Sequence, residues 1–552
     1  MRIDFSSCPG RALLLLALPL FFQAHLAPSP ALPLGQDVVS RVWVADNGDG
    51  TYKNPILYAD YSDPDVVRAG DDYYMVASSF NAVPGLPILH SKDLVNWSLI
   101  GHALTQQRPV DVYDKPQHGN GVWAPAIRYH HGEFYIYYPD PDYGIYVVKA
   151  KNPAGPWSDP LLIKEAKGWI DPCPLWDEDG SAYLVSAMAA SRSGIKSILV
   201  ISRMSADGTR LLDGGVMVFD GGDQNPTVEG PKLYKRNGYY YIFAPAGGVE
   251  GGWQLVLRAK NIYGPYEQRV VLAQGKTDIN GPHQGAWVET QSGESWFIHF
   301  QDKGAYGRVV HLQPVQWIND WPVIGVDREG RGQGEPVLSF KKPNVGRTWP
   351  KATPPDSDEF NQNGLGLQWQ WQANPQPNWA FPAGALGFVR LFAVPPPNGF
   401  QNFWDSPNLL LQKFPAPEFT VTTKVTFTPH GDGDKTGLII MGRDYAYLSV
   451  TKSRDGLVIS QVICKDADRH SVEKESTGVP LRQSTFYLRV KVSANAISQF
   501  SYSTDGREFI PVGERFTARQ GRWIGAKVGI FALGRAAQRE NGYSDFDWFH
   551  VE

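Results

Sequence analysis

The longer N-terminal part of the chain carries one short pattern five times: a turn with glycine, then aromatic residues, then an apolar run. The copies begin at Gly70, Gly132, Gly180, Gly238 and Gly293 and read "GDDYYMVASS", "GEFYIYYPD", "GSAYLVSA", "GYYYIFAPA" and "GESWFIHFQ". A strand-like lead-in precedes each copy, so each unit begins as a strand, a tight turn and a second apolar strand. The copies start roughly 50–60 residues apart, within the range of propeller-type repeats.

A second repeated pattern follows several of these copies. "HSKDLVNW" (His90–Trp97), "KAKNPAGPW" (Lys149–Trp157) and "RAKNIYGPY" (Arg258–Tyr266) share a strand end, a polar turn and an aromatic residue. Each unit therefore holds about four strands, and five such units predict a five-bladed β-propeller over residues 40–344. The alternative is a chance pattern within an all-β sandwich.

The pattern changes after a proline-rich stretch without periodicity, "VGRTWPKATPPDS" at 345–357, which we interpret as a linker. Beyond it "FTVTTKVTF" (Phe419–Phe427) alternates apolar and polar residues, and "FYLRVKV" (Phe486–Val492) nearly does. Asp505 and Gly506 form the turn of a hairpin. Residues 358–552 therefore predict a β-sandwich, and the whole chain is all-β.

The propeller prediction suggests a functional role for the segment "YSDPDVV" at 61–67. An Asp-Pro pair alone would indicate only a turn. The lead-in of each innermost strand lies at the central channel, where the five blades converge. Blades one, three and four place Asp63, Asp171 and Glu229 at matching points; blade two places Trp123, and blade five has His283 just upstream. Turn capping does not explain three acids at matching points.

Carboxylates grouped in this way suit glycoside hydrolysis. One ionised carboxylate draws a proton from water, and a second, kept protonated near neutral pH, donates a proton to the leaving oxygen. A third carboxylate nearby raises the pKa of its neighbour by like-charge repulsion.

Composition narrows the class of partner. The 552 residues have a formal net charge of -4 and no dominant basic stretch, so nucleic acid is not an expected partner. Aromatic residues make up 12% of the chain, which fits both sugar binding and a large β core.

The N-terminus indicates export. Arg2 and Arg11 precede the apolar run at 12–22, and small residues and prolines follow, so residues 1–31 predict a signal peptide and leader. A retained N-terminal anchor is the alternative. The rest of the sequence contains no apolar run of about 18 residues, the length needed to span a membrane. Removal of the signal leaves Cys173 and Cys464, too far apart in sequence to imply a disulfide framework. We expect a secreted or periplasmic protein.

Five motifs, taken in order, resemble glycoside hydrolase family 43, and more narrowly its two-domain β-xylosidases and α-L-arabinofuranosidases. They read "DPDVVR…DDYYMVASSFNAVPGLPILHSKDLVNW", "WAPAIRYHHGEFYIYY", "DPCPLWDEDGSAYL", "EGPKLYKRNGYYYIF" and "GRVVHLQPVQW". The resemblance runs from about Asn54 to the C-terminus. It implies inversion at the anomeric carbon and a concanavalin-like fold for the sandwich.

The resemblance also assigns roles. The general base falls on Asp63, the pKa-modulating aspartate on Asp171 and the general acid on Glu229. Phe80 matches a residue that lines the terminal sugar pocket, and Trp123 matches one of its walls. Arg308 matches an arginine that hydrogen-bonds sugar hydroxyls.

Other positions depart from the family pattern. Asp65 replaces a small residue and is interpreted as structural or supporting, while Asp60 and Asp72 are interpreted as turn residues. Many members place a histidine near a channel ion, often calcium. His283 fits this place with a one-residue slip, and Gln284 is the alternative. Water would supply most ligands of such an ion, and the chemistry requires no cofactor.

Three functions remain open. The first is an exo-acting glycosidase that releases xylose or arabinofuranose from xylan-derived oligosaccharides. The others are a non-catalytic carbohydrate-binding propeller and an endo-acting arabinanase. The sequence does not decide between the two pentoses, and it does not indicate an oligomeric state.

Overall fold

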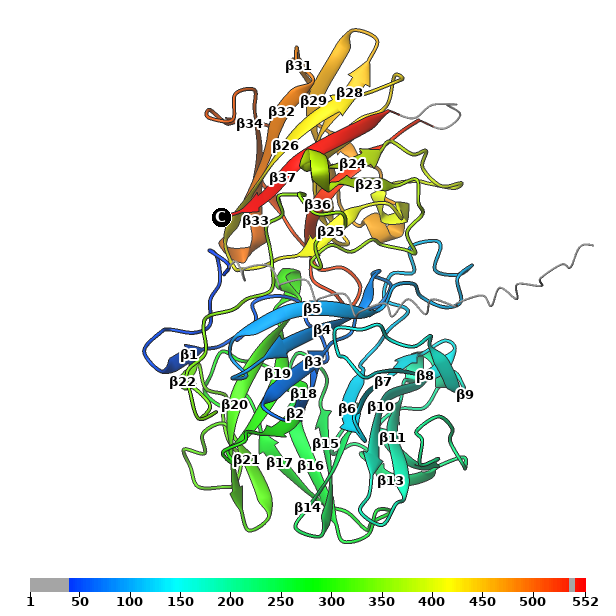
Figure 1. The fold of residues 1–552 in the computed structure, drawn as a ribbon, viewed down its shortest axis with the longest axis vertical. Coiled ribbons are helices and arrows are strands. Elements are labelled where there is room, and N and C mark those ends of the chain that lie inside the picture. Colours follow the sequence, from blue (N-terminus) through cyan, green and yellow to red (C-terminus); the bar gives the residue numbers. More distant parts are fainter. Residues whose placement is uncertain (1–38, 536–541) are drawn as a thin grey trace, which may run out of the picture. The chain divides into compact units, whose positions relative to one another are not determined.

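The computed structural model describes residues 39–535 and 542–552. The predicted signal segment at 1–31 lies outside the described residues. The regular secondary structure of the described chain is almost entirely β-strand, and Figure 1 colours these strands from blue to green in the first domain and from yellow-green to red in the second.

Five four-stranded antiparallel sheets confirm the predicted five-bladed propeller. The first two blades are β2 (Asp65–Ala69), β3 (Asp72–Val76), β4 (Gly85–Ser91) and β5 (Trp97–Leu104), then β6 (Ala126–His130), β7 (Glu133–Asp140), β8 (Gly144–Ala150) and β9 (Leu161–Glu165). The third is β10 (Trp169–Trp176), β11 (Ala182–Met188), β12 (Ile198–Met204) and β13 (Val216–Asp220). The fourth and fifth are β14 (Lys232–Arg236), β15 (Tyr239–Ala246), β16 (Trp253–Ala259) and β17 (Glu267–Leu272), then β18 (His283–Glu289), β19 (Ser295–Asp302), β20 (Arg308–Ile318) and β21 (Trp321–Ile324).

The recurring glycines form the turns between the first two strands of each blade. All five have positive φ, at +64°, +83°, +86°, +72° and +82° for Gly70, Gly132, Gly180, Gly238 and Gly293. Side chains with a Cβ adopt this backbone at a cost, whereas glycine does not. The apolar run after each turn then becomes the second strand, most of whose side chains are buried.

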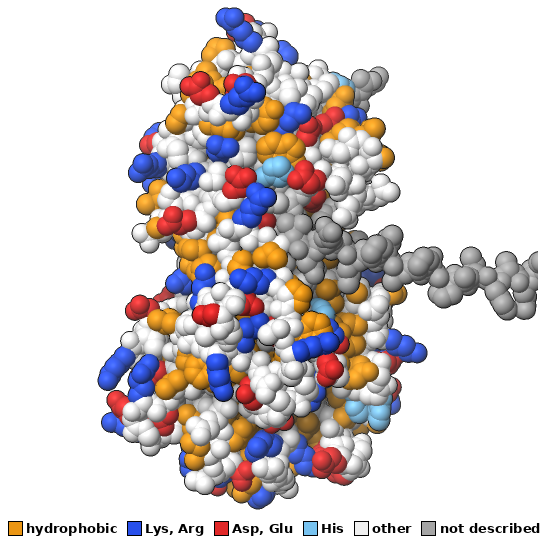
Figure 2. Space-filling view, turned by 60° about the vertical axis from the view of Figure 1, so that its left-hand side comes forward, with side chains coloured by type: hydrophobic (Ala, Val, Ile, Leu, Met, Phe, Trp, Pro, Cys, Tyr) orange, Lys and Arg blue, Asp and Glu red, His pale blue; other side chains and the backbone are white. Residues whose placement is uncertain are grey.

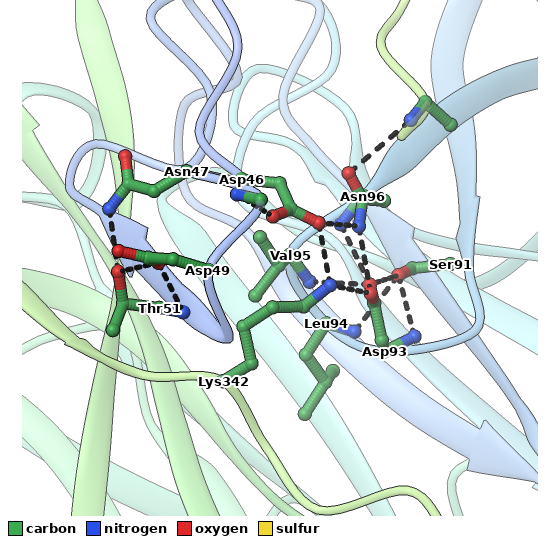
Figure 3. A network of polar contacts seen from close by, with 12 residues as sticks. Asp46, Asn47, Asp49, Thr51, Ser91, Asp93, Leu94, Val95, Asn96 and Lys342 are labelled. Carbon is green, nitrogen blue, oxygen red and sulfur yellow. Dashed lines mark hydrogen bonds and ion pairs between the residues drawn. The ribbon is translucent and has the colours of Figure 1, made fainter. Parts of the chain in front are cut away.

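The N-terminal segment closes the propeller ring against blade five. β1 (Thr51–Lys53) pairs with β22 (Ser339–Lys341), and Leu57 pairs with Val310. A polar network holds the same seam: Lys342 Nζ lies 2.6 Å from Asp46 and 2.8 Å from Asp93 (Figure 3). The network joins three separate segments, so it ties the two ends of the propeller domain to blade one.

Two sheets form the second domain and confirm the predicted sandwich. The larger has eight strands: β23 (Ala380–Ala383), β24 (Phe388–Phe392), β37 (Tyr543–Val551), β26 (Phe419–Thr428), β32 (Thr485–Ser493), β33 (Ile497–Ser503), β34 (Ile510–Pro511) and β35 (Phe516–Thr517). The smaller has seven: β25 (Leu410–Lys413), β36 (Lys527–Leu533), β27 (Lys435–Met441), β28 (Tyr445–Ser453), β29 (Gly456–Cys464), β30 (Lys474–Glu475) and β31 (Val479–Leu481).

The sandwich core is continuous with side chains of the propeller. Tyr58, Tyr306 and Val309 belong to the same buried apolar cluster as the sandwich interior. The nearby segment "QWQW" (Gln368–Trp371) contributes Trp369 and Trp371 to this packing, and both side chains are buried. Cys173 and Cys464 are both free, buried thiols.

The surface charge and the helix lengths are relevant to two kinds of partner, charged macromolecules and membranes. Figure 2 shows Lys and Arg side chains interspersed with Asp and Glu on the face in view, without a patch of a single sign. Among the described residues, no helix is long and apolar enough to cross a membrane.

Candidate active site

A small pocket of about 100 Å³ lies where the innermost strands of the blades converge. It brings together all six residues that the sequence proposed as catalytic or sugar-binding. The lining residues are Asp63, Phe80, Trp123, Ala124, Ile170, Asp171, Glu229, Val249, Gln284, Arg308 and Trp523.

The backbone at this pocket is strained in a repeated way. Asp63, Asp171 and Gln284 occupy matching points of blades one, three and five, with φ values of +55°, +56° and +39°. Phe80 has a φ of +49°. Non-glycine residues in the left-handed region are uncommon, and they concentrate at functional sites. The surrounding strands hold these four residues in an unfavourable conformation that directs their side chains.

Two β-bulges accompany this strain. The pairing of β10 with β11 shifts between Ile170 and Cys173, and the pairing of β18 with β19 shifts between His283 and Gly285. Bulges redirect side chains and are frequent beside active sites. Gln284 is the extra residue of the second bulge, which explains the one-residue slip in the motif of blade five.

Asp63 is held by donors from two blades. The hydroxyls of Ser62 and Ser78 each donate to its Oδ2 at 2.6 Å. The Arg308 guanidinium donates to Oδ1 at 3.1 Å and also to Ser62 Oγ at 2.8 Å. Arg308 is therefore both a lining residue of the pocket and the ion-pair partner of Asp63, which the sequence did not indicate.

The backbone beside Glu229 holds Asp171 in place. The backbone N–H of Gly230 donates to Asp171 Oδ2 at 2.7 Å, which fixes Asp171 directly beside Glu229. Burial, and then the charges of Asp171 and Asp63, raise the pKa of Glu229 from 4.5 to about 8. Burial also raises the pKa of Asp171. Glu229 keeps 25% of its side-chain surface exposed within the pocket, so it stays accessible to a substrate.

His283 lies behind Glu229, with Nε2 3.3 Å from Glu229 Oε1. Its ring is fully buried and stacks on Phe300, and neither nitrogen has a hydrogen-bond partner among the residues that the structure describes. Burial lowers the pKa of His283 to about 3, so the ring is neutral. Calcium prefers six to eight oxygen ligands, and within the described residues no cluster of three or more metal-ligating side chains forms. This donor set does not fit a calcium site made by the protein itself.

Aromatic rings form the walls of the pocket. Phe80 and Trp123 meet edge to face at 6.5 Å, and Trp123 is fixed by a hydrogen bond from its indole N–H to the Gly119 carbonyl. Trp523, from the sandwich domain, lies 6.3 Å from Trp123, and the Arg308 guanidinium lies 5.8 Å from its ring. Such rings pack against the C–H faces of a sugar and exclude water.

Trp523 lines the pocket, and reasoning from the sequence did not identify it. It lies in "QGRWIG", far from every propeller motif, and it is 47% exposed. An exposed tryptophan in a loop is the only local signal, and it does not reveal which surface the loop meets. Gln284, which the sequence suggested only as a metal contact, lines the pocket instead.

Three other acidic residues that the sequence singled out, Asp65, Asp60 and Asp72, do not line the pocket. Asp65 is fully buried and accepts hydrogen bonds from Ile127 N–H and Arg128, as expected of a structural residue. Asp60 was interpreted as a turn residue, and this was wrong: it is buried and accepts hydrogen bonds from Arg308 N–H and Gly525 N–H. Asp72 begins β3 and pairs with His90 and Lys92.

The arrangement supports acid–base chemistry at one bond. The Asp63 carboxylate is held by hydrogen-bond donors, and burial and neighbouring charge raise the pKa of the Glu229 carboxyl group. Both groups face a small space between aromatic walls. Paired carboxyl groups with contrasting environments are the basis of glycoside hydrolysis.

Comparison with known proteins gives the same picture for both domains. Residues 52–322 match the model described as "Glycosyl hydrolases family 43". Residues 357–552 match the model described as "Beta xylosidase C-terminal Concanavalin A-like domain".

Full-length relatives extend this similarity. A protein from Xylanibacter ruminicola is 42% identical over 507 residues, which cover 91% of this chain and 90% of the relative. The "Non-reducing end alpha-L-arabinofuranosidase" of Bacteroides ovatus is 29% identical over 93% of this chain and 97% of its own length. The crystal structure of a xylan beta-1,4-xylosidase from Bacillus halodurans matches with a TM-score of 0.80 at 27% identity, covering 91% of this chain and 99% of that one.

Proposed function

The chain belongs to glycoside hydrolase family 43, and we propose that it removes the terminal pentose from xylan-derived oligosaccharides by an inverting single displacement. The observation that carries this proposal is the pocket itself: Asp63, Asp171 and Glu229 meet beside aromatic walls contributed by both domains. A non-catalytic binding propeller would have no use for Glu229 with a pKa raised to about 8.

Asp63 acts as the general base. In an inverting hydrolase the base takes a proton from the water that attacks the anomeric carbon, on the face opposite the leaving group. Ser62, Ser78 and Arg308 all donate hydrogen bonds to this carboxylate, so its orientation is fixed before substrate binds. This preorganisation avoids reorientation in the transition state.

Glu229 acts as the general acid. It must be protonated near neutral pH to transfer a proton to the glycosidic oxygen as the bond breaks, and its raised pKa meets this requirement. Asp171 supports the acid in two ways: its charge raises the pKa of Glu229, and its bond from Gly230 N–H positions the neighbouring backbone. Asp171 itself transfers no proton.

The pocket favours a terminal sugar over the interior of a chain. Trp523 adds a wall from the sandwich domain, which argues against the open groove of an endo-acting arabinanase. A pentose suits so small a space because it lacks the exocyclic CH₂OH of a hexose. We rank β-xylosidase activity ahead of α-L-arabinofuranosidase activity, supported by relatives such as the "Beta-xylosidase" of Formosa agariphila, 32% identical over 91% of this chain.

Hydrolysis of 4-nitrophenyl β-D-xyloside and 4-nitrophenyl α-L-arabinofuranoside under one condition tests the proposal. We expect turnover of both, with the larger kcat/KM for the xyloside, and little turnover of the corresponding β-D-glucoside. Turnover of neither pentoside, or of the glucoside alone, would contradict the proposed function.

No step of this reaction depends on a bound metal. Any calcium ion at His283 would take most of its ligands from water. We therefore expect dialysis against EDTA to leave kcat/KM unchanged. Loss of activity that added calcium restores would contradict this expectation.

Export is a separate proposal that rests on the sequence of residues 1–31 alone. N-terminal sequencing of protein recovered outside the cytoplasm tests it. We expect a mature chain that begins between Ala24 and Ala31. A chain that begins at Met1 would contradict cleavage.

A further inference from the structure

Asp60 is a buried carboxylate that the catalytic mechanism does not use. It is 4% exposed and lies three residues before Asp63 in the segment that enters blade one. Its Oδ1 accepts a hydrogen bond from the backbone N–H of Arg308 at 2.9 Å. Its Oδ2 accepts one from the backbone N–H of Gly525 at 2.9 Å. One carboxylate therefore joins the propeller strand that carries Arg308 to the sandwich loop that carries Trp523.

The two backbones meet closely around this carboxylate. Ala526 N–H donates to the Ala305 carbonyl at 2.7 Å. A Cβ at Gly307 would lie 2.5 Å from Asp60 Cγ, and a Cβ at Gly525 would lie 2.7 Å from the Gly307 nitrogen. Glycine at both positions thus permits the approach that brings the loop within reach of Asp60.

Sandwich cations lie around the same carboxylate. Lys413 on β25 is half-buried and Lys527 on β36 is buried, and loss of solvation lowers the pKa of both. The Asp60 charge acts in the opposite direction on each lysine. The negative charge of Asp60 thus favours the positive charges of two sandwich lysines, in addition to its hydrogen bond to the sandwich backbone.

We propose that Asp60 is a positioning residue that holds the Trp523 loop over the pocket, with the Arg308 backbone as its fixed point on the propeller. Arg308 is held at both ends by one short segment: Asp60 binds its N–H, and Asp63 binds its guanidinium. Trp523 lies only two residues from Gly525, so the bond to Asp60 sets where its ring stands relative to Arg308 and Trp123. This inference rests on the proposed function, because it concerns how the sugar-binding wall is completed.

The first test is Asp60→Asn, with kinetics on xylobiose. An asparagine oxygen can accept one of the two N–H bonds, while its NH₂ group faces the other donor. A wall that contacts the sugar equally in the ground state and the transition state changes KM more than kcat. We expect KM to rise about tenfold and kcat to change less than about threefold.

A double-mutant cycle separates positioning from general destabilisation. Asp60→Asn weakens a buried hydrogen bond and removes a negative charge that favours protonated Lys413 and Lys527, so we expect a lower unfolding temperature whatever its role. If Asp60 acts through Trp523, its effect on KM should fall below about threefold in a Trp523→Ala background, because coupled residues are not additive. No rise in the wild-type background, or a rise of threefold or more that persists without Trp523, would overturn the proposal.

Two further variants keep the test decisive. Gly525→Ala forces the loop away from the propeller and leaves Asp60 intact, so it should raise KM in the same way even if Asp60→Asn does not fold. Asp358→Asn is the matched control, since each oxygen of this sandwich carboxylate also accepts a backbone N–H, from Phe360 and Gly366. It should lower the unfolding temperature without changing KM. A wild-type chain inactive on both xylobiose and 4-nitrophenyl α-L-arabinofuranoside would refute the proposed function instead. An active chain whose KM is unchanged in both Asp60→Asn and Gly525→Ala would refute only the positioning role.

Discussion

At the scale of single residues, the proposed reaction depends on Glu229 as the proton donor. We expect Glu229→Gln to lower kcat on xylobiose by ~10²–10⁴, because its leaving group needs protonation. The loss should be much smaller on 4-nitrophenyl β-D-xyloside, whose leaving group departs without help. Glu289→Gln, on the same inner layer of strands but at the other mouth of the channel, is the matched control and should retain activity. Equal losses on both substrates would remove Glu229 from this role.

Asp171 should control the alkaline limb of the pH–rate profile. The acid is active only while Glu229 is protonated, so activity falls as pH rises through the raised pKa of Glu229. Asp171→Asn removes a negative charge that raises this pKa, so the limb should move to lower pH. The measurement is kcat against pH for both enzymes on xylobiose. An unmoved limb with a lower plateau would instead make Asp171 a sugar-binding residue.

The sequence predicted residues of this site to different degrees, for a physical reason. Asp63, Asp171 and Glu229 were recognisable because a repeat places equivalent positions at one axis, so three acids at matching points stand out. Asp60 gave no such signal, since its partners are backbone N–H groups of Arg308 and Gly525, which any sequence supplies. Trp523 reaches the pocket only through the packing of one domain on another, which local patterns do not encode.

At the scale of elements, the strands and their turns could be predicted and the deviations from them could not. The glycine and aromatic pattern predicted the first two strands of every blade, because it specifies a left-handed turn followed by a buried strand. The bulges at Asp171 and Gln284 were not visible, because a bulge adds one residue without changing residue types. The only sign of the bulge at Gln284 in the sequence was the one-residue slip of the motif around His283.

The seam that closes the propeller gives a prediction at this scale. Lys342 is 14% exposed and pairs with two carboxylates that are 5% and 2% exposed (Figure 3). Lys342→Met would leave both carboxylates buried without their cation, which should cost about 3–5 kcal/mol of unfolding free energy. Its neighbour Lys341 is 68% exposed and lies 3.9 Å from Glu294, so Lys341→Met is the matched control, with an expected cost below about 1 kcal/mol. Guanidinium unfolding of both variants measures the difference, and equal costs would show that the network does not hold the seam.

At the scale of the whole molecule, the sandwich completes a site whose acids all belong to the propeller. We expect Trp523→Ala to raise KM for xylobiose about tenfold with little change in the unfolding temperature, because the side chain is half exposed. Phe381→Ala is the matched control, since Phe381 is 58% exposed on β23 and does not line the pocket. An unchanged KM for Trp523→Ala would mean that the sandwich only supports the propeller.

The central claim is that the whole chain is an inverting hydrolase that releases one pentose at a time from a chain end. Proton NMR of xylotetraose hydrolysis tests this most directly, because it identifies the first products and the anomer of the new reducing end before mutarotation. We predict xylose and xylotriose as the first products, with the released xylose appearing first as the α-anomer, since inversion converts the β-linkage. Early xylobiose without xylose, or released xylose that appears first as the β-anomer, would contradict the account.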